Sequence, residues 1–190
     1  SSFVRQARGS ILSIFPHKSD PEVTASLLNV LGTEGVEPDA LANSNSAVSA
    51  VLKDESVSRI TQALFRPFRF SAYRTPADWK LAEKGKEKLY KEVVASYQEK
   101  KPKEYVLEWR DGQELFRVKL NKHNLCEVGT AFRELSRQGI VLTFLITSPT
   151  REKGEAMLSL ALPHSKKQHY RKVLEDLSTG NVIETASPVA

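Results

Sequence analysis

The sequence predicts an α+β protein built from two βαββαβ repeats with antiparallel sheets, joined by a helix. The order strand, helix, strand, strand, helix, strand occurs between Ile11 and Phe70, and a similar series returns after Leu115. One constant offset brings the two series into register over their first halves. Cap and turn residues also stand where elements should begin and end. The 190 residues, 40% hydrophobic and 27% charged, are enough for one large or two small domains with genuine cores.

The offset is fixed by the Gly-aliphatic pairs that end the first helix of each series, Gly35-Val36 and Gly139-Ile140. It equals 139 − 35 = 104, and it places apolar residues on apolar residues. The pairs are Ile14 with Val118, Leu28 with Phe132 and Leu31 with Leu135, and Ser44 falls on Ser148. Farther on, Ser56 corresponds best to Ser165, an offset of 165 − 56 = 109. We therefore expect an insertion in the second hairpin, supplied by residues 149–154.

The first repeat carries a local signal for each element. An apolar strand is expected at 11–15, and Ser19 or Asp20 can cap a helix in which Pro21 takes the first position. Gly35 can adopt the left-handed backbone conformation that commonly ends an α-helix. Strand 46–51, a helix after Asp54 and a closing strand at 68–70 complete the series. The apolar helix stripes are Val23, Leu27, Leu28 and Leu31, then Val57, Ile60, Leu64 and Phe65.

The second repeat is preceded by a hairpin signal. Residues 105–109 and 115–120 flank Asp111-Gly112, a pair that tolerates the positive backbone angles of a tight turn. We thus expect an extra strand before this repeat. Val128, Phe132 and Leu135 form the next helix stripe, 141–146 has the composition of the most buried strand, and 157–162 alternates cleanly.

Between the repeats, residues 79–98 carry apolar side chains at helical spacing. We therefore expect a first domain at 8–74, a connecting helix at 75–103 and a second domain at 104–186. Residues 1–10 and 184–190 carry no packing signal and are expected to fray.

Charge and composition exclude several classes of protein. The net charge of +5 and pI near 9.3 suggest a nucleic-acid surface, but the eight lysines between 80 and 103 are interleaved with four glutamates. Residues 166–172 are basic with a single aromatic residue, Tyr170, which disfavours base stacking. No apolar run could span a membrane, so we expect a cytoplasmic protein that binds neither nucleic acid nor membrane. Cys126, the single cysteine, cannot form an internal disulfide, and we expect it to be a small buried residue.

No catalytic constellation is visible. The four histidines lie apart, without cysteine or carboxylate at metal-ligand spacing. Ser44 and Ser148 do not lie in a Gly-x-Ser-x-Gly elbow, and a glycine-rich phosphate loop is lacking. We expect no enzyme activity, no metal and no cofactor.

One segment resembles a known family. The run 35–49, followed by Leu52-Lys53-Asp54 and a helix ending Ala63-Leu64, resembles the ACT domains of the C-terminal regulatory region of aspartokinase. The resemblance covers most of 11–70, and the second half matches in layout. It implies two ferredoxin-like, ACT-like domains and a regulatory part without its kinase.

The resemblance also implies a ligand site. ACT domains pair side by side into larger sheets and often hold an amino acid at the seam, using the loop after the first strand and the second strand. The residues at these places are His17, Lys18, Ser19, Asp20, Asp39, Asn43, Ser44 and Asn45, with Asn121, Lys122, His123, Asn124, Thr147 and Ser148 in the second repeat. The implied partners are an amino-acid effector, a second copy in a homodimer and an enzyme of amino-acid metabolism.

Two readings of these loops stay open. The family commonly has a glycine just before the helix, whereas here Pro21 removes a backbone donor and Glu22 and Glu127 would repel a carboxylate. The loops are then either ligand sites or simple capped helix starts. The protein is accordingly either an amino-acid sensor or a ligand-free interaction module.

Overall fold

The computed structural model describes residues 8–71, 74–82, 110–178 and 183–184. The chain divides into two compact units, one comprising Ser1–Ile60 with Gly112–Ala190 and the other Thr61–Asp111. Both repeats contribute to the larger unit.

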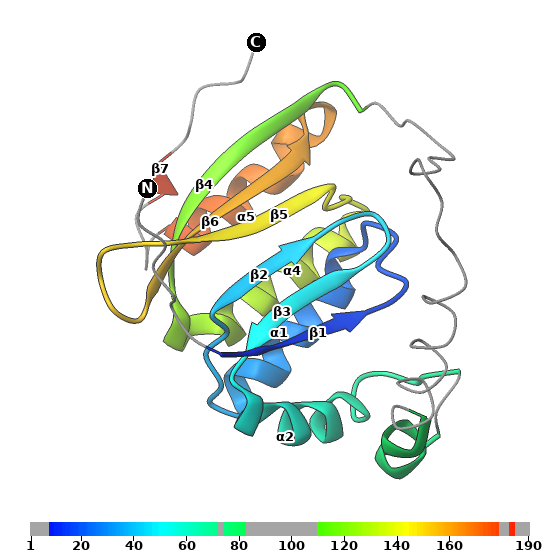
Figure 1. Ribbon diagram of the computed structural model, residues 1–190. Helices are drawn as coiled ribbons and strands as arrows, with labels where there is room; N and C mark the ends of the chain where they lie inside the picture. Colours follow the sequence, from blue (N-terminus) through cyan, green and yellow to red (C-terminus); the bar gives the residue numbers. More distant parts are fainter. Residues whose placement is uncertain (1–7, 72–73, 83–109, 179–182, 185–190) are drawn as a thin grey trace, which may run out of the picture. The chain divides into compact units, whose positions relative to one another are not determined.

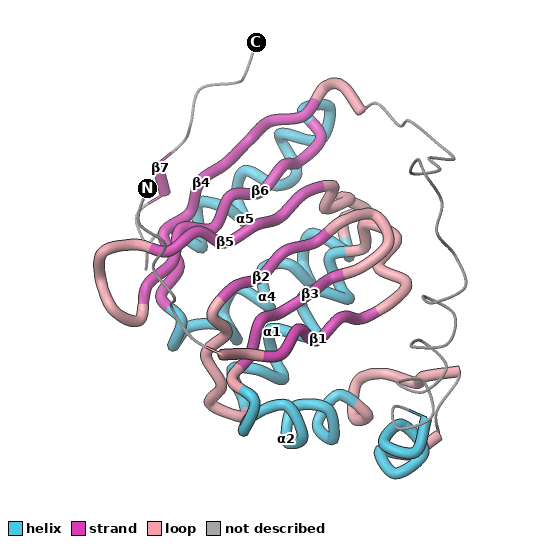
Figure 2. Tube along the Cα trace, in the orientation of Figure 1, coloured by secondary structure: helices cyan, strands magenta, loops and turns pink. Residues whose placement is uncertain are grey.

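The larger unit contains one seven-stranded antiparallel sheet (Figures 1 and 2). Its strand order is β1-β3-β2-β5-β6-β4-β7. The strands are β1 (Ser10–Ile14), β2 (Ala40–Asn43), β3 (Val48–Leu52), β4 (Gln113–Asn121), β5 (Phe144–Pro149), β6 (Glu155–Pro163) and β7 (Ile183–Glu184). The first repeat thus supplies β1, β2 and β3, the second supplies the rest, and the repeats meet where β2 pairs with β5.

The helices α1 (Pro21–Thr33), α4 (Leu125–Arg137) and α5 (Lys167–Ser178) lie on one face of this sheet (Figure 1). Short 3-10 turns, η1 (Lys122–Asn124) and η2 (His164–Lys166), lead into α4 and α5. The core lies between the helices and the sheet, and its largest buried side chains include Leu28, Leu31, Phe132, Leu135 and Tyr170. Helix α2 (Asp54–Leu64) spans the boundary of the two units.

Helices α1 and α4 pack closely because glycines stand at their contact. A Cβ atom at Gly129 would lie 2.6 Å from the Asn29 side-chain amide and 3.0 Å from the Ala25 carbonyl oxygen. At Gly32 it would lie 2.5 Å from the Cys126 Sγ atom. The repeats are therefore joined in both layers, through the sheet and through this helix pair.

The expected α+β fold of βαββαβ-like repeats is confirmed. Both aligned glycines follow a helix end with positive φ, +62° at Gly35 and +64° at Gly139. The next residues repeat the same capping bond, from Val36 N to the Leu31 carbonyl and from Ile140 N to the Leu135 carbonyl. The expected hairpin insertion is also present. Asn43 pairs with Val48 and the equivalent Thr147 pairs with Leu158, so the offset in the strand after the hairpin is 158 − 48 = 110.

Several detailed expectations were wrong. Residues 68–69 are irregular and Phe70 is a single bridge residue, so 68–70 is not a sheet strand. Strand β5 begins at Phe144, not at 141, and Phe144 and Ile146 are exposed because they project from the sheet face opposite α1, α4 and α5. Ser10 and Glu184, expected in frayed ends, lie in β1 and β7. Cys126 is exposed because it lies outside the buried stripe of Leu125, Val128 and Phe132, at the border of the α1–α4 contact.

In the smaller unit, residues 76–82 are helical. The Asp78 carboxylate accepts hydrogen bonds from the backbone N–H groups of Arg74 and Thr75, and the Thr75 hydroxyl accepts one from Asp78 N, which caps the helix start. The rest of the expected connecting helix, and the extra strand at 105–109, lie outside the described residues. Within the described residues, no helix has the length and apolar character needed to cross a membrane.

Candidate functional site

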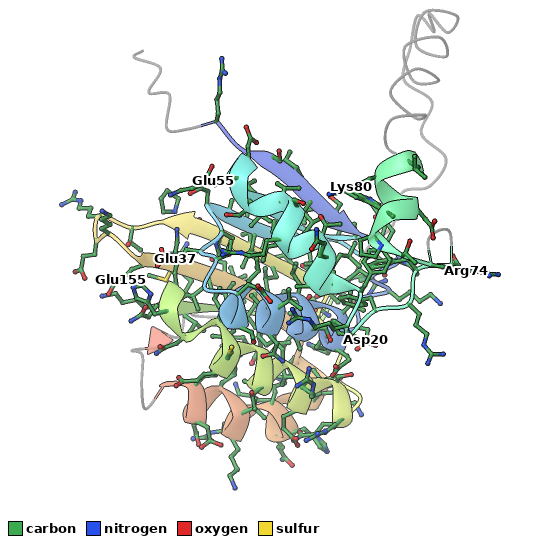
Figure 3. The ribbon with its side chains drawn as sticks, turned by 90° about the horizontal axis from the view of Figure 1, so that it is seen from below. Asp20, Glu37, Glu55, Arg74, Lys80 and Glu155 are labelled. Atoms are coloured by element: carbon green, nitrogen blue, oxygen red, sulfur yellow. The ribbon has the colours of Figure 1, made fainter. Side chains whose placement is uncertain are left out.

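The seam between the repeats is formed by β2 and β5, which pair antiparallel with Ala42 opposite Ile146 and Asn43 opposite Leu145. Because the strands are antiparallel, each end of the seam combines parts of both repeats. The first end of the seam consists of the loop 15–20, the turn 44–47 and the segment 140–143. The second end consists of the segment 121–124, the hairpin 150–154 and the segment 36–39. Figure 3 shows Asp20 and Glu37 far apart, one at each end.

At the first end, the loop 15–20 is fastened to the β2–β3 turn. His17 N donates to the Ser46 carbonyl (2.9 Å) and Lys18 N to the Asn45 carbonyl (2.8 Å). The Ser19 hydroxyl donates to Asn45 Oδ1 (3.0 Å). Lys18 and Ser19 both have positive φ, 54° and 55°, a conformation that costs L-residues energy and is held here by these bonds.

His17 lies fully buried beneath this loop. Its Nδ1 atom is 3.0 Å from the Ser44 carbonyl oxygen and its Nε2 atom is 2.9 Å from the Thr24 hydroxyl. Since a carbonyl can only accept, Nδ1 carries the proton and a neutral ring accepts at Nε2 from Thr24. Burial lowers the pKa of His17, and it outweighs the opposite effects of the Ser44 bond and the Asp20 charge. The neutral His17 side chain therefore links its own loop to the β2–β3 turn and to α1 through hydrogen bonds.

Leu142 of the second repeat is held from two sides by the first repeat. Its N–H donates to the Ser19 carbonyl (2.8 Å), and its carbonyl accepts from Asn43 Nδ2 (3.1 Å). Asn43 itself is 9% exposed, and its Oδ1 atom is buried without a hydrogen-bond partner. Buried acceptors are nearly always bonded in folded proteins, so this oxygen is an unusual feature of the seam.

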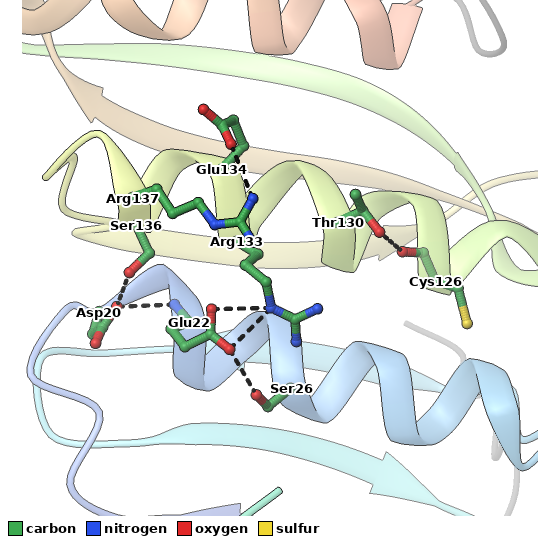
Figure 4. Close-up of polar contacts among 9 residues, drawn as sticks. All are labelled: Asp20, Glu22, Ser26, Cys126, Thr130, Arg133, Glu134, Ser136 and Arg137. Carbon is green, nitrogen blue, oxygen red and sulfur yellow. Dashed lines mark hydrogen bonds and ion pairs between the residues drawn. The ribbon is translucent and has the colours of Figure 1, made fainter.

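The start of α1 is occupied by side chains of this chain (Figure 4). Asp20 Oδ1 accepts from Glu22 N (2.9 Å) and from the Ser136 hydroxyl of α4 (2.8 Å). Arg133 Nε donates to both Glu22 carboxylate oxygens, at 3.1 and 3.2 Å. Asp20 thus caps the helix, and the charge of Glu22 is compensated by α4.

The second end is closed by different contacts. Lys122 N donates to the Gly154 carbonyl (2.9 Å), and Asn121 Oδ1 accepts from His123 N (2.9 Å). His123 Nδ1 lies 3.2 Å from Glu37 Oε1 of the first repeat. The Thr147 hydroxyl accepts from Leu41 N (2.7 Å) and donates to the Leu41 carbonyl (3.3 Å).

The fourteen residues proposed from the sequence are thus divided between the two ends. The first end gathers those of the first loop and turn, which are His17, Lys18, Ser19, Asp20, Asn43, Ser44 and Asn45. The second end gathers Asn121, Lys122, His123, Asn124, Thr147 and Ser148, and also Asp39, which precedes β2 and lies away from the other first-repeat residues. Asn124 precedes α4 without a side-chain cap bond, and Ser148 is exposed on β5.

One polar cluster was missed from the sequence. The buried Glu114 carboxylate on β4 accepts from His164 (2.7 Å), Lys167 (2.9 Å) and the Tyr170 hydroxyl (2.8 Å). The Lys167 bond, with those of Tyr170 and His164, lowers the pKa of Glu114 to about 2 against its desolvation. Burial and Glu114 raise the pKa of Tyr170. Strand alternation could have shown that Glu114 is buried, because it lies on the same side of the strand as Phe116 and Val118, which face the core.

The arrangement offers hydrogen-bonding groups and no assembled metal site. Among the described residues, no group of three or more His, Cys, Asp or Glu side chains could hold a metal ion. At the first end, the buried Asn43 Oδ1 atom is an acceptor that N–H donors of a small molecule could satisfy.

Comparison with known proteins supports the fold assignment. No family model and no curated protein sequence matches the chain. The structure is similar to a crystal structure of aspartate kinase from Synechocystis, with a TM-score of 0.61 and 13% sequence identity. The match covers 93% of this chain and 28% of the aspartate kinase chain, so this chain spans less than a third of that protein. The resemblance to an aspartokinase ACT regulatory region is therefore confirmed at the level of the fold.

Proposed function

We propose that this chain is a non-catalytic regulatory protein of two ACT-like domains that binds a small molecule, such as an amino acid, at the seam between them. The domains are assigned to 8–74 and 104–186, with 75–103 as the connecting helix. The observation that carries the proposal is the buried Asn43 Oδ1 atom, an acceptor without a partner at the junction of the two repeats. A ligand with N–H donors would satisfy it.

The position of Leu142 suggests how binding would be reported. Its N–H and carbonyl groups are both bound by the first repeat, through Ser19 and Asn43. A ligand that inserts beside Asn43 would compete with these bonds and favour a different arrangement of the segment 140–143. Regulation requires such a difference in affinity between two states.

The sensing proposal includes the biological setting expected from the family resemblance. The protein is placed in the cytoplasm, as a homodimer, with an enzyme of amino-acid metabolism as its partner. Its ligand is an amino-acid effector.

A thermal-shift screen against the twenty proteinogenic amino acids tests the sensing function. At a concentration of 100 Kd a ligand adds about 2.7 kcal/mol to the free energy of unfolding. For a chain of this size the melting temperature would rise by roughly 5–10 °C. The D-enantiomer of any active compound is the control for nonspecific effects. No stabilisation by any amino acid at millimolar concentration would refute the proposal.

The alternative, a ligand-free interaction module, is favoured by the sheet face opposite α1, α4 and α5. Ile11, Phe144 and Ile146 are exposed there by 72%, 42% and 40%. Exposed apolar patches often mark protein interfaces. Light scattering after size exclusion tests this function. A dimer that Ile146→Asp converts to a monomer is expected, whereas a strict monomer at all concentrations would contradict it.

A further inference from the structure

We infer that the two ends of the seam are unequal, so that the chain binds one amino acid, at the first end, through donation from the ligand's ammonium group to Asn43 Oδ1. This inference rests on the proposed function and adds to it the number of sites and the group that is recognised. It follows from comparing equivalent positions in the two repeats.

Asn43 and Thr147 are equivalent, because the offset of 104 that aligns the repeats relates them. Each is a polar residue at the seam that reaches into the other repeat. The Thr147 hydroxyl uses both its acceptor and its donor on the Leu41 backbone. Asn43 uses its donor on Leu142, while its buried oxygen has no partner. Hydrogen-bonding capacity therefore remains at one of the two positions.

The charges around the first end select the ligand group. Asn43 Oδ1 is an acceptor, so it needs a donor, and of the two charged ends of an amino acid only the ammonium group donates. The backbone donors of His17, Lys18 and Glu22 are already bound within the chain. The Asp20 carboxylate at the start of α1 disfavours an approaching carboxylate, while the charge of Glu22 is compensated by Arg133. The ligand carboxylate is then directed away from the seam.

The polar groups at the second end are paired within the chain. His123 is joined to Glu37, and Lys122 N is bound to Gly154. The Glu155 carboxylate nearby is paired with Lys119 Nζ at 2.7 Å. Glu155 Oε2 is buried without a hydrogen-bond partner, as Asn43 Oδ1 is, but this ion pair compensates its charge, whereas Asn43 Oδ1 is left with unused hydrogen-bonding capacity.

A nitrogen-15 NMR titration with glycine tests the inference, because glycine carries only the two charged ends common to amino acids. Methylammonium and acetate, which carry one end each, are the matched probes. We expect saturable shifts from glycine and methylammonium at 17–20, 43–45 and Leu142, and none from acetate. Saturable shifts at 121–124 or 147–154, or equal shifts from acetate, would overturn it. A glycine titration without any saturable shift would also overturn it, while the proposed function would still be decided by the twenty-compound screen.

Two substitutions at the equivalent positions sharpen the test. Asn43→Leu removes the free oxygen, and Thr147→Val removes the satisfied hydroxyl with little change in shape. We expect Asn43→Leu to weaken glycine binding by about tenfold or more and Thr147→Val by less than about twofold. If Asn43→Leu does not fold, Asn43→Val gives the same comparison with a side chain suited to a strand. Equal losses in the Asn43 and Thr147 variants would contradict the inference.

Discussion

Helices α1 and α4 contact each other in two regions that occupy equivalent positions in the two repeats but differ in chemistry. In one region Glu22 binds Arg133 and Asp20 binds Ser136. By the repeat offset of 104, Cys126 is equivalent to Glu22, and Asn29 is equivalent to Arg133. In that second region Cys126 Sγ lies 3.9 Å from the Asn29 carbonyl oxygen, and the Asn29 side-chain NH2 group donates to the Cys126 carbonyl oxygen (3.2 Å), so hydrogen bonds replace the ion pair.

The comparison shows which features are duplicated. The helix ends, the apolar stripes and the close contact at Gly32 and Gly129 recur or serve both repeats, so they define the scaffold. The polar residues at equivalent positions differ, so they define what each end can do. Substitutions at equivalent positions should therefore agree in the core and disagree at the ends.

The largest effects are expected in the core, where the repeats should behave alike. Leu28 and Phe132 are equivalent and both are nearly fully buried. Truncation of either to alanine should lower the free energy of unfolding by about 3–4 kcal/mol through lost burial and a cavity. Urea denaturation measures this. A loss below about 1 kcal/mol at one position only would show that the two cores are not equivalent.

A smaller effect should distinguish the first strands of the repeats. Glu114→Gln removes a buried carboxylate with three donors, and about 2 kcal/mol of stability should be lost at pH 7. The folded pKa of about 2 lies below the ordinary value of 4.5, so the carboxylate stabilises the native protein fully above about pH 5. That stability is lost as the pH falls from 5 toward 2.

Melting temperatures recorded between pH 7 and pH 2 check the Glu114 prediction. Ser10→Ala is the matched control, because Ser10 bonds Asp54 at the corresponding place on β1 and is part of an exposed pair. The control should leave the acid side of the profile unchanged. An unaltered profile in Glu114→Gln would contradict the assigned role of the cluster.

The two histidines at the ends should also differ. His17 is buried, and its pKa lies below the ordinary value of 6.5, whereas the His123 side chain is 71% exposed. Below pH 6.5 the unfolded chain binds a proton that folded His17 resists, so stability falls as the pH decreases through that range. NMR titration of the imidazole C–H signals should give a midpoint below 6.5 for His17. The decline in stability should diminish in His17→Asn and persist in His123→Asn, and a His17 midpoint above 6.5 would refute it.

The scaffold could be predicted from the sequence because its signals are local and repeated. Gly35 and Gly139 end helices for the same conformational reason, and the apolar stripes at Leu28 and Phe132 face the core by periodicity alone. The strand at 141–146 was misjudged because an apolar run does not reveal that one sheet face lacks helices. The Phe68–Phe70 pattern likewise depends on tertiary contacts that alternation cannot report.

The polar site was predictable only in part. The loop and turn residues from His17 to Asn45 were identified by the family resemblance, yet their division between two ends follows from the antiparallel pairing of β2 with β5. Strand alternation marks Glu114 as inward-facing, but it does not identify its partners. Those partners, and the surroundings of Asn43 Oδ1, depend on which atoms meet across fifty or more residues of sequence.

The smallest expected effect on stability concerns the ion pair between Glu22 of α1 and Arg133 of α4. The Glu22 and Arg133 side chains are about one-third to two-fifths exposed, so their ion pair should contribute only about 0.5 kcal/mol. Because Glu22 also lies in the first turn of α1, Glu22→Gln alone would lose a helix-dipole contribution as well. A double-mutant cycle with Arg133→Met separates the two, and its coupling energy should shrink in 1 M salt. Cys126→Ser at the equivalent position should change stability by less than the cycle does. A coupling energy above about 2 kcal/mol, unchanged by salt, would mean that Glu22 and Arg133 behave as a buried ion pair. The two repeats would then differ in their scaffold as well as in their polar ends.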